Sequence, residues 1–348
     1  MVKSLRHFAH IFSNNAAFRK VIGLLDQPSG ERPNLLRVLT YHRVDVPEAR
    51  PWLDPVLISA SPEVFDIQMK YISANYRPIS VSEVLEAGQG NDQTTLPPRA
   101  ILITFDDAYQ DFKQHAWPVL KRYQIPVTLF VPTGFPDHPE SLFWWDRLFY
   151  ALNSTIKSEI NSSIGTFSIG TNKERSQANL RLKTHIKSLP NDEAIAFIEE
   201  IEQQLNVSPR PNCVLGWNEL RELAQEGVTL VPHTQTHPIM NNIPLTAMQN
   251  EALASLNDLQ REIGETLPVF AYPSGFYNPE VVNAVRDAGI ELAFTTERGI
   301  NILGRDDPLL MQRINVGAQT TLPILQAQLL SLSASLYPIG KKVLNVFG

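Results

Sequence analysis

The sequence predicts an α/β fold: a distorted (β/α) barrel of about seven parallel strands, with a helical insertion and a flanking helix at each end. Short apolar segments with the composition of buried strands alternate with segments whose apolar residues recur every three or four positions. This alternation is typical of parallel sheets with right-handed helical crossovers. No Gly-rich dinucleotide-binding loop follows any of the strands, so an open doubly wound sheet is the second choice.

Segments rich in Val, Ile, Leu and Phe are predicted as strands at residues 35–41, 100–105, 127–131, 228–231, 269–272, 292–295 and 309–316. The predicted helices between them span residues 62–74, 112–123, 217–226, 245–263 and 279–288. Ser61 is a predicted N-cap with Pro62 at the first helical position, and Gly227, Gly264 and Gly289 stand where helices end. These local signals agree with the alternation.

Residues 136–216 interrupt the alternation, and we expect them to form an insertion on one strand–helix loop. Residues 5–25 have the spacing of an amphipathic helix with a basic opposite face, and residues 322–346 have a similar pattern. The predicted domains are an N-terminal helix (1–30), the barrel (31–320) and a C-terminal helix (321–348). We expect the terminal helices to pack on the protein's own core or on a partner, with peripheral membrane contact by the N-terminal helix as the alternative.

Composition excludes several classes of function. The 348 residues include 30 Lys and Arg against 36 Asp and Glu, a net charge of −6, so we expect no nucleic-acid partner. Cys213 is the single cysteine, which excludes an intramolecular disulfide and a cysteine metal cage. No segment approaches the roughly 20 apolar residues of a membrane span. Residues 1–23 lack the apolar core of a secretory signal, so the expected location is cytoplasmic, with membrane association as the alternative.

Ionisable residues follow or lie on several predicted strands. The carboxyl ends of parallel strands and the loops leaving them meet on one rim of a barrel, where active sites are built. The residues expected on this rim are His42, Asp106, Asp107, His233, His237 and Arg313.

Two imidazoles and one carboxylate can bind a divalent metal and leave positions open for water. Zinc held in this way lowers the pKa of its water to about 7, and a second carboxylate can then act as general base. Taken singly, Asp106 and Asp107 are explained equally well by a turn, and the two histidines are better explained as unrelated surface residues. Together they predict a hydrolase of an amide or ester.

The pattern resembles the polysaccharide deacetylase family, the metal-dependent de-N-acetylases with a NodB-homology domain, similar to carbohydrate esterase family 4. Residues 104–107 (Thr-Phe-Asp-Asp) match its first motif, and residues 233–237 match its His-Ser/Thr-x-x-His motif. Residues 272–275 (Tyr-Pro-Ser-Gly) resemble its third. Residues 39–42 (Leu-Thr-Tyr-His) and 143–146 (Phe-Trp-Trp-Asp) look like the branch found with bacterial exopolysaccharide synthesis. The resemblance covers roughly residues 35–316 and implies the barrel fold.

The resemblance also implies roles for single residues. It makes Asp107, His233 and His237 metal ligands and Asp106 the general base. The backbone N–H of Ser274 matches the position that binds the oxyanion of the tetrahedral intermediate.

The sequence departs from the family pattern at three places. Ala108 stands where the first motif usually continues with Gly. Ala271 stands where the family has an Arg that orients the base, and Arg313 is our predicted substitute. The last strand lacks the family's proton-donating His, and we expect His42 on the first strand to protonate the leaving amine.

Four residues are predicted to bind substrate: Tyr272, Thr234, Tyr109 and Trp144. Thr234 also matches a family position that braces the histidine loop. Trp144 belongs to an aromatic cluster in the insertion that we expect either to bind sugar faces or to form a small core of its own.

The sequence thus predicts a metal-dependent hydrolase that removes N-acetyl groups from an N-acetylated sugar polymer or lipid-linked glycan. Zn²⁺ is the predicted metal, with Co²⁺, Ni²⁺ and Fe²⁺ as alternatives. The alternative functions are an O-deacetylase, a small-amide hydrolase, or a catalytically silent glycan-binding protein. No oligomeric state is predicted.

Overall fold

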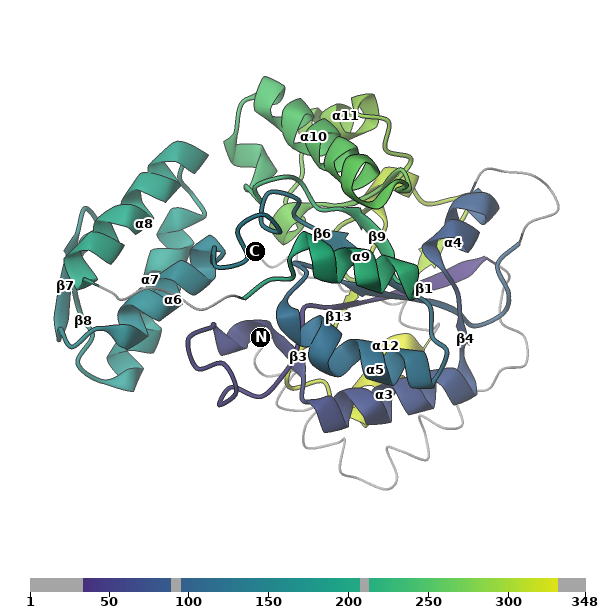
Figure 1. The fold of residues 1–348 in the computed structure, drawn as a ribbon, viewed down its shortest axis with the longest axis horizontal. Helices are drawn as coiled ribbons and strands as arrows, with labels where there is room; N and C mark the ends of the chain where they lie inside the picture. The colour runs from purple at the N-terminus through teal and green to yellow at the C-terminus, as the bar shows by residue number, and fades with distance from the viewer. Residues whose placement is uncertain (1–33, 89–94, 207–212, 331–348) are drawn as a thin grey trace, which may run out of the picture.

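The structure is a computed structural model that describes residues 34–88, 95–206 and 213–330. It is an α/β fold around a mixed seven-stranded sheet (Figure 1). The parallel strands β1 (Leu35–Tyr41), β5 (Ala100–Phe105), β6 (Val127–Val131) and β9 (Thr229–Pro232) lie side by side in this order. The predictions for β1, β5 and β6 are confirmed to the residue, and β9 begins one residue later than predicted.

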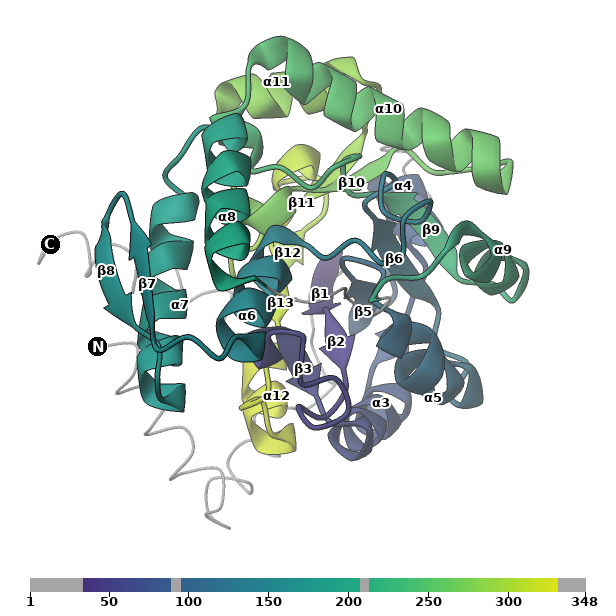
Figure 2. The same cartoon turned by 60° about the vertical axis from the view of Figure 1, so that its left-hand side comes forward.

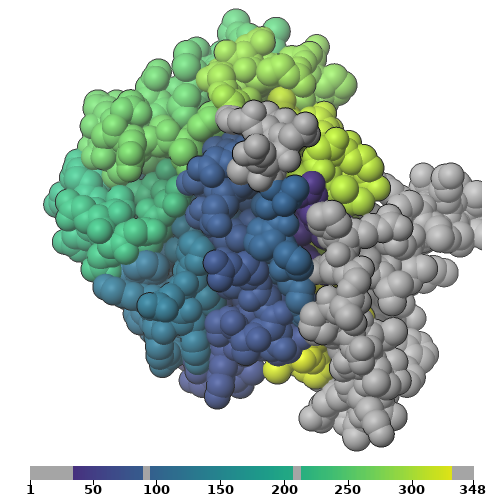
Figure 3. All heavy atoms as spheres, turned by 90° about the vertical axis from the view of Figure 1, so that its right-hand side faces the viewer, coloured from purple at the N-terminus to yellow at the C-terminus, as the bar shows by residue number. Residues whose placement is uncertain are grey.

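Three short strands complete the sheet. Strand β13 (Ile314–Asn315) runs parallel to β1, β12 (Asn301–Ile302) runs antiparallel to it, and β4 (Arg77–Pro78) pairs with β5. Figure 3 shows the purple start of the described chain beside a yellow late segment on one face, as the pairing of β1 with β12 requires.

A second parallel pair, β10 (Val269–Ala271) and β11 (Leu292–Phe294), continues the curve of the sheet, and Phe294 bridges to Met311 just before β13. Among the described residues no hydrogen-bonded ladder joins β9 to β10, so backbone pairing does not close the predicted barrel. The sequence explains this gap in part: Pro232 lacks an N–H donor, and the carbonyl of Leu230 accepts the hydroxyl of Thr266 at 3.3 Å.

The strands are buried on both faces, as expected of parallel strands covered by helices. Along β1, Leu36 and Val38 face one apolar cluster inside the curve of the sheet, while Leu39 and Tyr41 face a second cluster beneath the helices. Apolar clusters on both faces of the sheet therefore fix the position of the strand ends at its edge.

The helices lie outside the curve of the sheet, between the strands in sequence (Figures 1 and 2). They are α3 (Pro62–Asn75), α4 (Val81–Gly88), α5 (Trp117–Arg122), α9 (Trp217–Gln225), α10 (Leu245–Ile263) and α11 (Pro279–Asp287). The capping prediction for α3 is confirmed: the hydroxyl of Ser61 accepts the Val64 N–H at 3.3 Å, and Pro62 is the first helical residue.

Two sequence predictions are corrected. Residues 112–123 do not form one α-helix, because a π-helical turn (Phe112–Ala116) precedes α5, where Pro118 has no N–H to donate. The predicted strand 309–316 is mostly absent, because Pro308–Leu310 form a 3₁₀ turn capped by Asp307, whose side chain accepts the Leu309 N–H at 2.9 Å.

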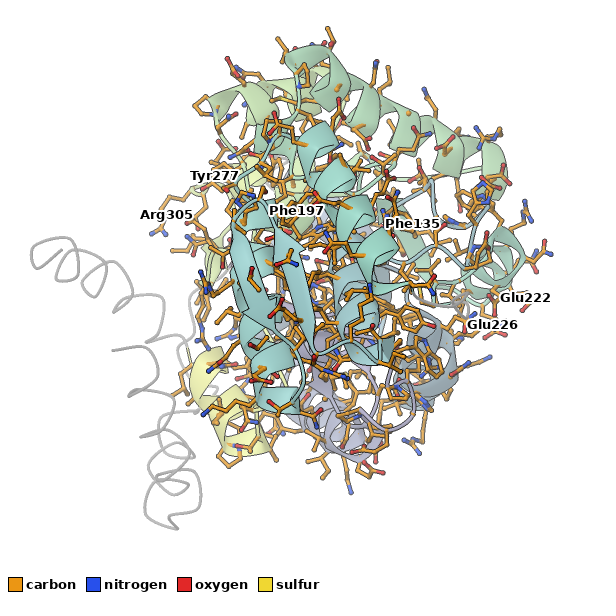
Figure 4. The ribbon with its side chains drawn as sticks, turned by 90° about the vertical axis from the view of Figure 1, so that its left-hand side faces the viewer. Phe135, Phe197, Glu222, Glu226, Tyr277 and Arg305 are labelled. Atoms are coloured by element: carbon orange, nitrogen blue, oxygen red, sulfur yellow. The ribbon has the colours of Figure 1, made fainter. Side chains whose placement is uncertain are left out.

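The insertion forms a helical lobe beside the sheet (Figure 1). It contains α6 (Trp144–Ser154), a hairpin of β7 (Glu159–Ser162) and β8 (Gly165–Ser168), α7 (Asn172–Ile186) and α8 (Asn191–Leu205). These elements share an apolar cluster of their own, which includes Phe197 (Figure 4). Phe135 lies in a separate cluster where the lobe meets the sheet.

The terminal helices are only partly described. Helix α12 (Leu322–Leu329) packs Leu325 and Leu329 into the same cluster as Phe65 and Met69 of α3. The N-terminal helix predicted for residues 1–30, and residues 331–348 of the C-terminal one, lie outside the described residues. Within the described ranges, no helix combines the length and the apolar composition that crossing a membrane requires.

Candidate active site and metal centre

The two aspartates of the site follow β5 directly. The Asp106 N–H donates to the carbonyl of Tyr41 at 3.0 Å, which continues the β1–β5 pairing by one residue. The chain then turns sharply, with positive φ at Asp107 (74°) and Ala108 (52°). The two carboxylates therefore leave the strand end in different directions.

The two histidines come from the loop that follows β9. Thr234 has a φ of 65° and His237 a φ of 58°, so the loop curls back on itself. The Thr234 hydroxyl accepts the His237 N–H at 3.0 Å and donates to the carbonyl of His233. The ring centroids of His233 and His237 consequently lie 4.9 Å apart.

Asp107 lies between the two imidazoles. Its Oδ1 is 3.6 Å from Nε2 of His233 and 3.4 Å from Nε2 of His237. One ligand atom from each of the three residues lies within 4.8 Å of the others, and all three side chains are buried. Distant segments of the chain thus bring three ligating groups together.

The polar atoms of this cluster fit a divalent metal. Oδ1 of Asp107 is buried and has no hydrogen-bond partner in the described chain, although buried polar atoms are nearly always paired. Nδ1 of His233 lies 2.7 Å from the carbonyl of Ala271, which leaves Nε2 free to bind a cation. One carboxylate oxygen and two imidazole nitrogens are a donor set that Zn²⁺ and related ions accept.

Electrostatics also favour a cation here. Burial, together with the neighbouring Asp106 and Asp146, raises the pKa of Asp107 well above its usual range. Burial lowers the pKa of His233 to about 4 and that of His237 well below its ordinary value. Both imidazoles are neutral at neutral pH, as metal binding requires.

Asp106 has a different environment. Nη1 and Nη2 of the fully buried Arg313 donate to its two carboxylate oxygens at 2.9 and 2.8 Å, and Nε of Arg313 donates to the carbonyl of Thr295 at 2.8 Å. Burial by itself raises the pKa of Asp106, but Arg313, His233 and His42 outweigh it and lower the pKa to about 2. Asp106 is therefore ionised throughout the neutral range. The structure thus places Arg313 against Asp106, the residue predicted as general base.

His42, which follows β1, lies beside the carboxylate of Asp106. Its Nε2 is 3.9 Å from Oδ2 of Asp106. A quarter of its side chain is exposed, whereas Asp106 is 3% exposed, so His42 is at the open side of the cluster. Burial and Arg313 lower its pKa against the opposing effect of Asp106.

Ser274 lies in the 3₁₀ turn Pro273–Gly275 that follows β10. It has a φ of 54° and Gly275 a φ of 72°. A Cβ on Gly275 would lie 1.9 Å from the Thr296 hydroxyl oxygen, so the turn admits only glycine there. The hydrogen bond between Nδ1 of His233 and the carbonyl of Ala271 connects this third motif to the histidine loop.

Three of the four predicted substrate-binding residues are interior residues instead. Tyr272 is fully buried and its hydroxyl donates to the carbonyl of Leu309 at 3.0 Å. Thr234 is fully buried and braces the histidine loop. Tyr109 is fully buried and donates to Oδ2 of Asp146 at 2.5 Å. Trp144 is half-buried, and together with His237 it lines a mainly apolar pocket between the insertion and the histidine loop.

The sequence analysis missed two residues that contact the cluster. The rings of Phe143 and Trp145 pack against His237, with centroids 5.4 and 4.9 Å from its ring. The sequence predicts that the aromatic cluster containing residues 143–146 either binds sugar faces or forms a small core of its own. The available sequence signal was the run of three aromatic residues at positions 143–145.

Comparison with known proteins places the chain in a family. The model of the polysaccharide deacetylase family matches residues 93–293, more than half of the chain and most of the site. The chain belongs to the polysaccharide deacetylase family. It is accordingly a hydrolase acting on carbon–nitrogen bonds other than peptide bonds.

Individual relatives agree with this assignment. The deacetylase chain is 22% identical over 271 residues to a putative polysaccharide deacetylase, YxkH, of Bacillus subtilis, with 77% of this chain and 67% of the relative covered. It is 32% identical over 97 residues to the poly-β-1,6-N-acetyl-D-glucosamine N-deacetylase of Escherichia coli K12, a match to 28% of this chain and only 13% of that protein.

Among solved structures, the fold is similar to that of the Streptococcus pyogenes deacetylase PplD in complex with acetate. The TM-score is 0.58 at 20% identity, with 86% of this chain and 99% of that chain covered. This deacetylase therefore has the fold of a solved deacetylase across most of its described residues.

Proposed function

We propose that this deacetylase is a metal-dependent de-N-acetylase of a glycan that contains N-acetylated sugars. The observation that carries the proposal is the convergence of Asp107, His233 and His237 beside the Asp106–Arg313 ion pair. The name of the Escherichia coli relative supports N-acetylglucosamine as the sugar. The preferred metal is Zn²⁺, with Co²⁺, Ni²⁺ and Fe²⁺ as alternatives.

In this proposal Asp107, His233 and His237 hold the metal. A divalent cation bound there polarises the acetyl carbonyl and lowers the pKa of a water molecule. Asp106, kept ionised and correctly oriented by Arg313, accepts the proton of the attacking water. The Ser274 N–H donates to the oxyanion, for which the turn Pro273–Gly275 provides a constrained backbone.

His42 gives the proton to the departing amine. Because its pKa is lowered, His42 is neutral at neutral pH and gains its proton during the reaction. Asp106 is the nearby source, since Nε2 of His42 is 3.9 Å from Oδ2. A quarter of the His42 side chain is exposed, so a glycan can reach it from the solvent.

The test is acetate release from N-acetylated oligosaccharides, including poly-β-1,6-N-acetylglucosamine, with and without a chelator. Acetate and free amine should appear in equal amounts, and chelation or Asp107→Asn should abolish both. Glu222→Gln is the matched control, because Glu222 is an exposed carboxylate on α9 that pairs with Lys113 at 2.6 Å (Figure 4). Release of acetate without amine, or release that resists chelation, would contradict the proposal.

A further inference from the structure

The segment Phe-Trp-Trp-Asp at residues 143–146 begins α6, and the proposed reaction leaves it without a role. It belongs to the insertion, yet its buried side chains turn away from the insertion's own core. They share an apolar cluster with Leu53, Tyr109 and residues 213–214, which lie outside α6–α8. This segment is where the insertion contacts the metal ligands.

Two of its rings enclose His237. The indole of Trp145 lies 4.9 Å from the His237 ring at 71°, and the Phe143 ring lies 5.4 Å away at 69°. Phe143 and Trp145 stack on each other at 4.7 Å with planes only 3° apart. Both are buried, and edge-to-face packing of this kind fixes relative ring orientation.

The two histidines of the site differ in what orients them. Nδ1 of His233 is fixed by the carbonyl of Ala271 at 2.7 Å. Nδ1 of His237 is buried and has no hydrogen-bond partner within the described residues. A metal-binding histidine almost always has such a partner, because the ring must be held with its ligating nitrogen toward the metal. Something else must hold the His237 ring.

We propose that Trp145, backed by Phe143, is a positioning residue that holds the His237 imidazole in the orientation for metal binding. The inference rests on the proposed metal site. It assigns to two ring contacts the task that a hydrogen bond performs at His233.

The orientation of Trp145 is itself fixed by a buried chain of hydrogen bonds. Its Nε1 donates to the Tyr109 hydroxyl at 3.0 Å, and Tyr109 donates to Oδ2 of Asp146 at 2.5 Å. Oδ1 of Asp146 accepts the N–H of Asp54 at 2.8 Å. Tyr109 is two residues from Asp107. The series of hydrogen bonds therefore connects Trp145, which packs against His237, to the loop that carries the third ligand, Asp107.

This chain also reaches deeper into the insertion. Oδ2 of Asp54 accepts the side-chain amide of Asn179 at 3.2 Å and pairs with Lys183, both on α7. The neighbouring Trp144 is different: it is half-buried, lines the pocket beside His237, and packs its ring edge-on against Trp145 at 5.5 Å. Of the two adjacent tryptophans, only Trp145 is placed to position the ligand.

The test compares Trp145→Leu and Trp145→Phe with the same changes at Trp117. Trp117 is also buried and donates its N–H, to Glu226 at 2.6 Å, but it lies on α5 away from the site. Metal affinity is measured by Zn²⁺ competition with a chelating dye, and coordination geometry by the visible spectrum of the Co²⁺ protein. Trp145→Leu should weaken Zn²⁺ binding by about 10-fold or more and change the Co²⁺ spectrum. Trp145→Phe, which keeps a ring there, should recover part of the affinity.

The Trp117 variants should bind both metals as the wild type does. Equal Zn²⁺ affinity and an unchanged Co²⁺ spectrum in Trp145→Leu would overturn the inference, as would an equal loss in Trp117→Leu. If Trp145→Leu does not fold, Tyr109→Phe removes the hydroxyl that holds the indole, and unchanged metal binding in that variant would overturn the inference. Wild-type protein that binds neither metal would instead contradict the proposed metal site.

Discussion

At the scale of residues, one buried ion pair between Arg313 and Asp106 sets the charge of the site. The guanidinium of Arg313 donates two hydrogen bonds to Asp106 and a third to the carbonyl of Thr295, and together they allow it only one orientation. Removing one partner of a buried pair leaves an unpaired charge, which costs about 3–5 kcal/mol. Arg313 therefore matters both to the proposed reaction and to the fold.

We predict that Arg313→Gln moves the acid limb of activity to higher pH. Without the guanidinium, burial raises the pKa of Asp106 from about 2, so the carboxylate protonates at a pH where the wild type is still ionised. The measurement is the pH dependence of kcat/KM for acetate release. Arg305→Gln, at an exposed arginine beside Asp306, should keep the wild-type profile (Figure 4). An unshifted acid limb in Arg313→Gln would show that Asp106 does not need this partner.

The same pair predicts a pH-dependent stability. The pKa of Asp106 in the folded protein is about 2, below its ordinary value of 3.8, so its ionisation favours folding. This contribution, about 2–3 kcal/mol, is complete above pH 4 to 5 and is lost as pH falls toward 2. Urea unfolding should show that Arg313→Gln is less stable than the wild type at pH 7, with a smaller difference near pH 3. A constant difference over this range would argue against the linkage.

A variant of His42 tests whether this residue is the proton donor. His42→Ala should lower kcat by roughly 10²-fold while the bound metal, measured by elemental analysis, stays at the wild-type level. His138→Ala is the control, since the His138 side chain is 69% exposed and pairs with the nearby Glu140 at 3.7 Å. Near-normal turnover in His42→Ala would exclude this residue as the acid.

At the scale of elements, the site depends on turns that follow strands. The turn after β5 places two carboxylates, the turn after β9 two imidazoles, and the turn after β10 the Ser274 amide. Each turn contains a non-glycine residue with positive φ, a conformation that costs energy and persists where its surroundings require it. The motifs therefore fix the backbone conformation of each turn as well as the chemistry of its side chains.

Gly275 allows a direct test of the third turn. Gly275→Ala should lower the free energy of unfolding more than Gly227→Ala, because both glycines have positive φ but only Gly275 has Thr296 against the added Cβ. The positive φ alone costs about 1–2 kcal/mol in either variant, and the steric clash adds to it at Gly275. Denaturant midpoints with equal slopes give the comparison. Equal losses would mean that Thr296 moves aside without cost.

At the scale of the whole molecule, the proposed metal would join segments that are distant in the sequence. Asp107 leaves β5, the histidines leave β9, and the rings that flank His237 come from the insertion. Without a cation, Asp107 is a buried carboxylate with an unpaired oxygen. Its burial is a stability cost that binding would remove.

We predict that Zn²⁺ stabilises the wild type and not Asp107→Asn. A ligand at about 100 times its Kd stabilises the folded state by about 2.7 kcal/mol, which appears as a higher Tm. Without metal, Asp107→Asn should be at least as stable as the wild type, because an amide avoids the buried charge. Thermal unfolding with Zn²⁺ and with a chelator measures both. A Zn²⁺-induced rise in Tm that survives in Asp107→Asn would place the metal elsewhere.

The sequence by itself determined the strands β1, β5 and β6, the cap of α3 and the family, because each depends on local composition or on a short motif. It also named the residues that converge, since strand ends on one rim of parallel strands must be neighbours. The predicted substrate contacts failed for Tyr109, Thr234 and Tyr272, which are buried, although the predicted bracing of the histidine loop by Thr234 is confirmed. The reason is that a polar group beside a motif has the same local pattern whether it faces substrate or the interior.

Only the tertiary structure decided what surrounds those residues. Arg313 meets Asp106 across 207 positions of sequence, and Trp145 meets His237 from an inserted lobe. The sequence predicts the Arg313 contact only through the family resemblance and does not predict the Trp145 contact, because both follow from the curvature of the sheet and the docking of the insertion. The physical reason is that ligand identity is a property of single side chains, whereas the orientation and pKa of a ligand depend on neighbours that the fold brings from elsewhere.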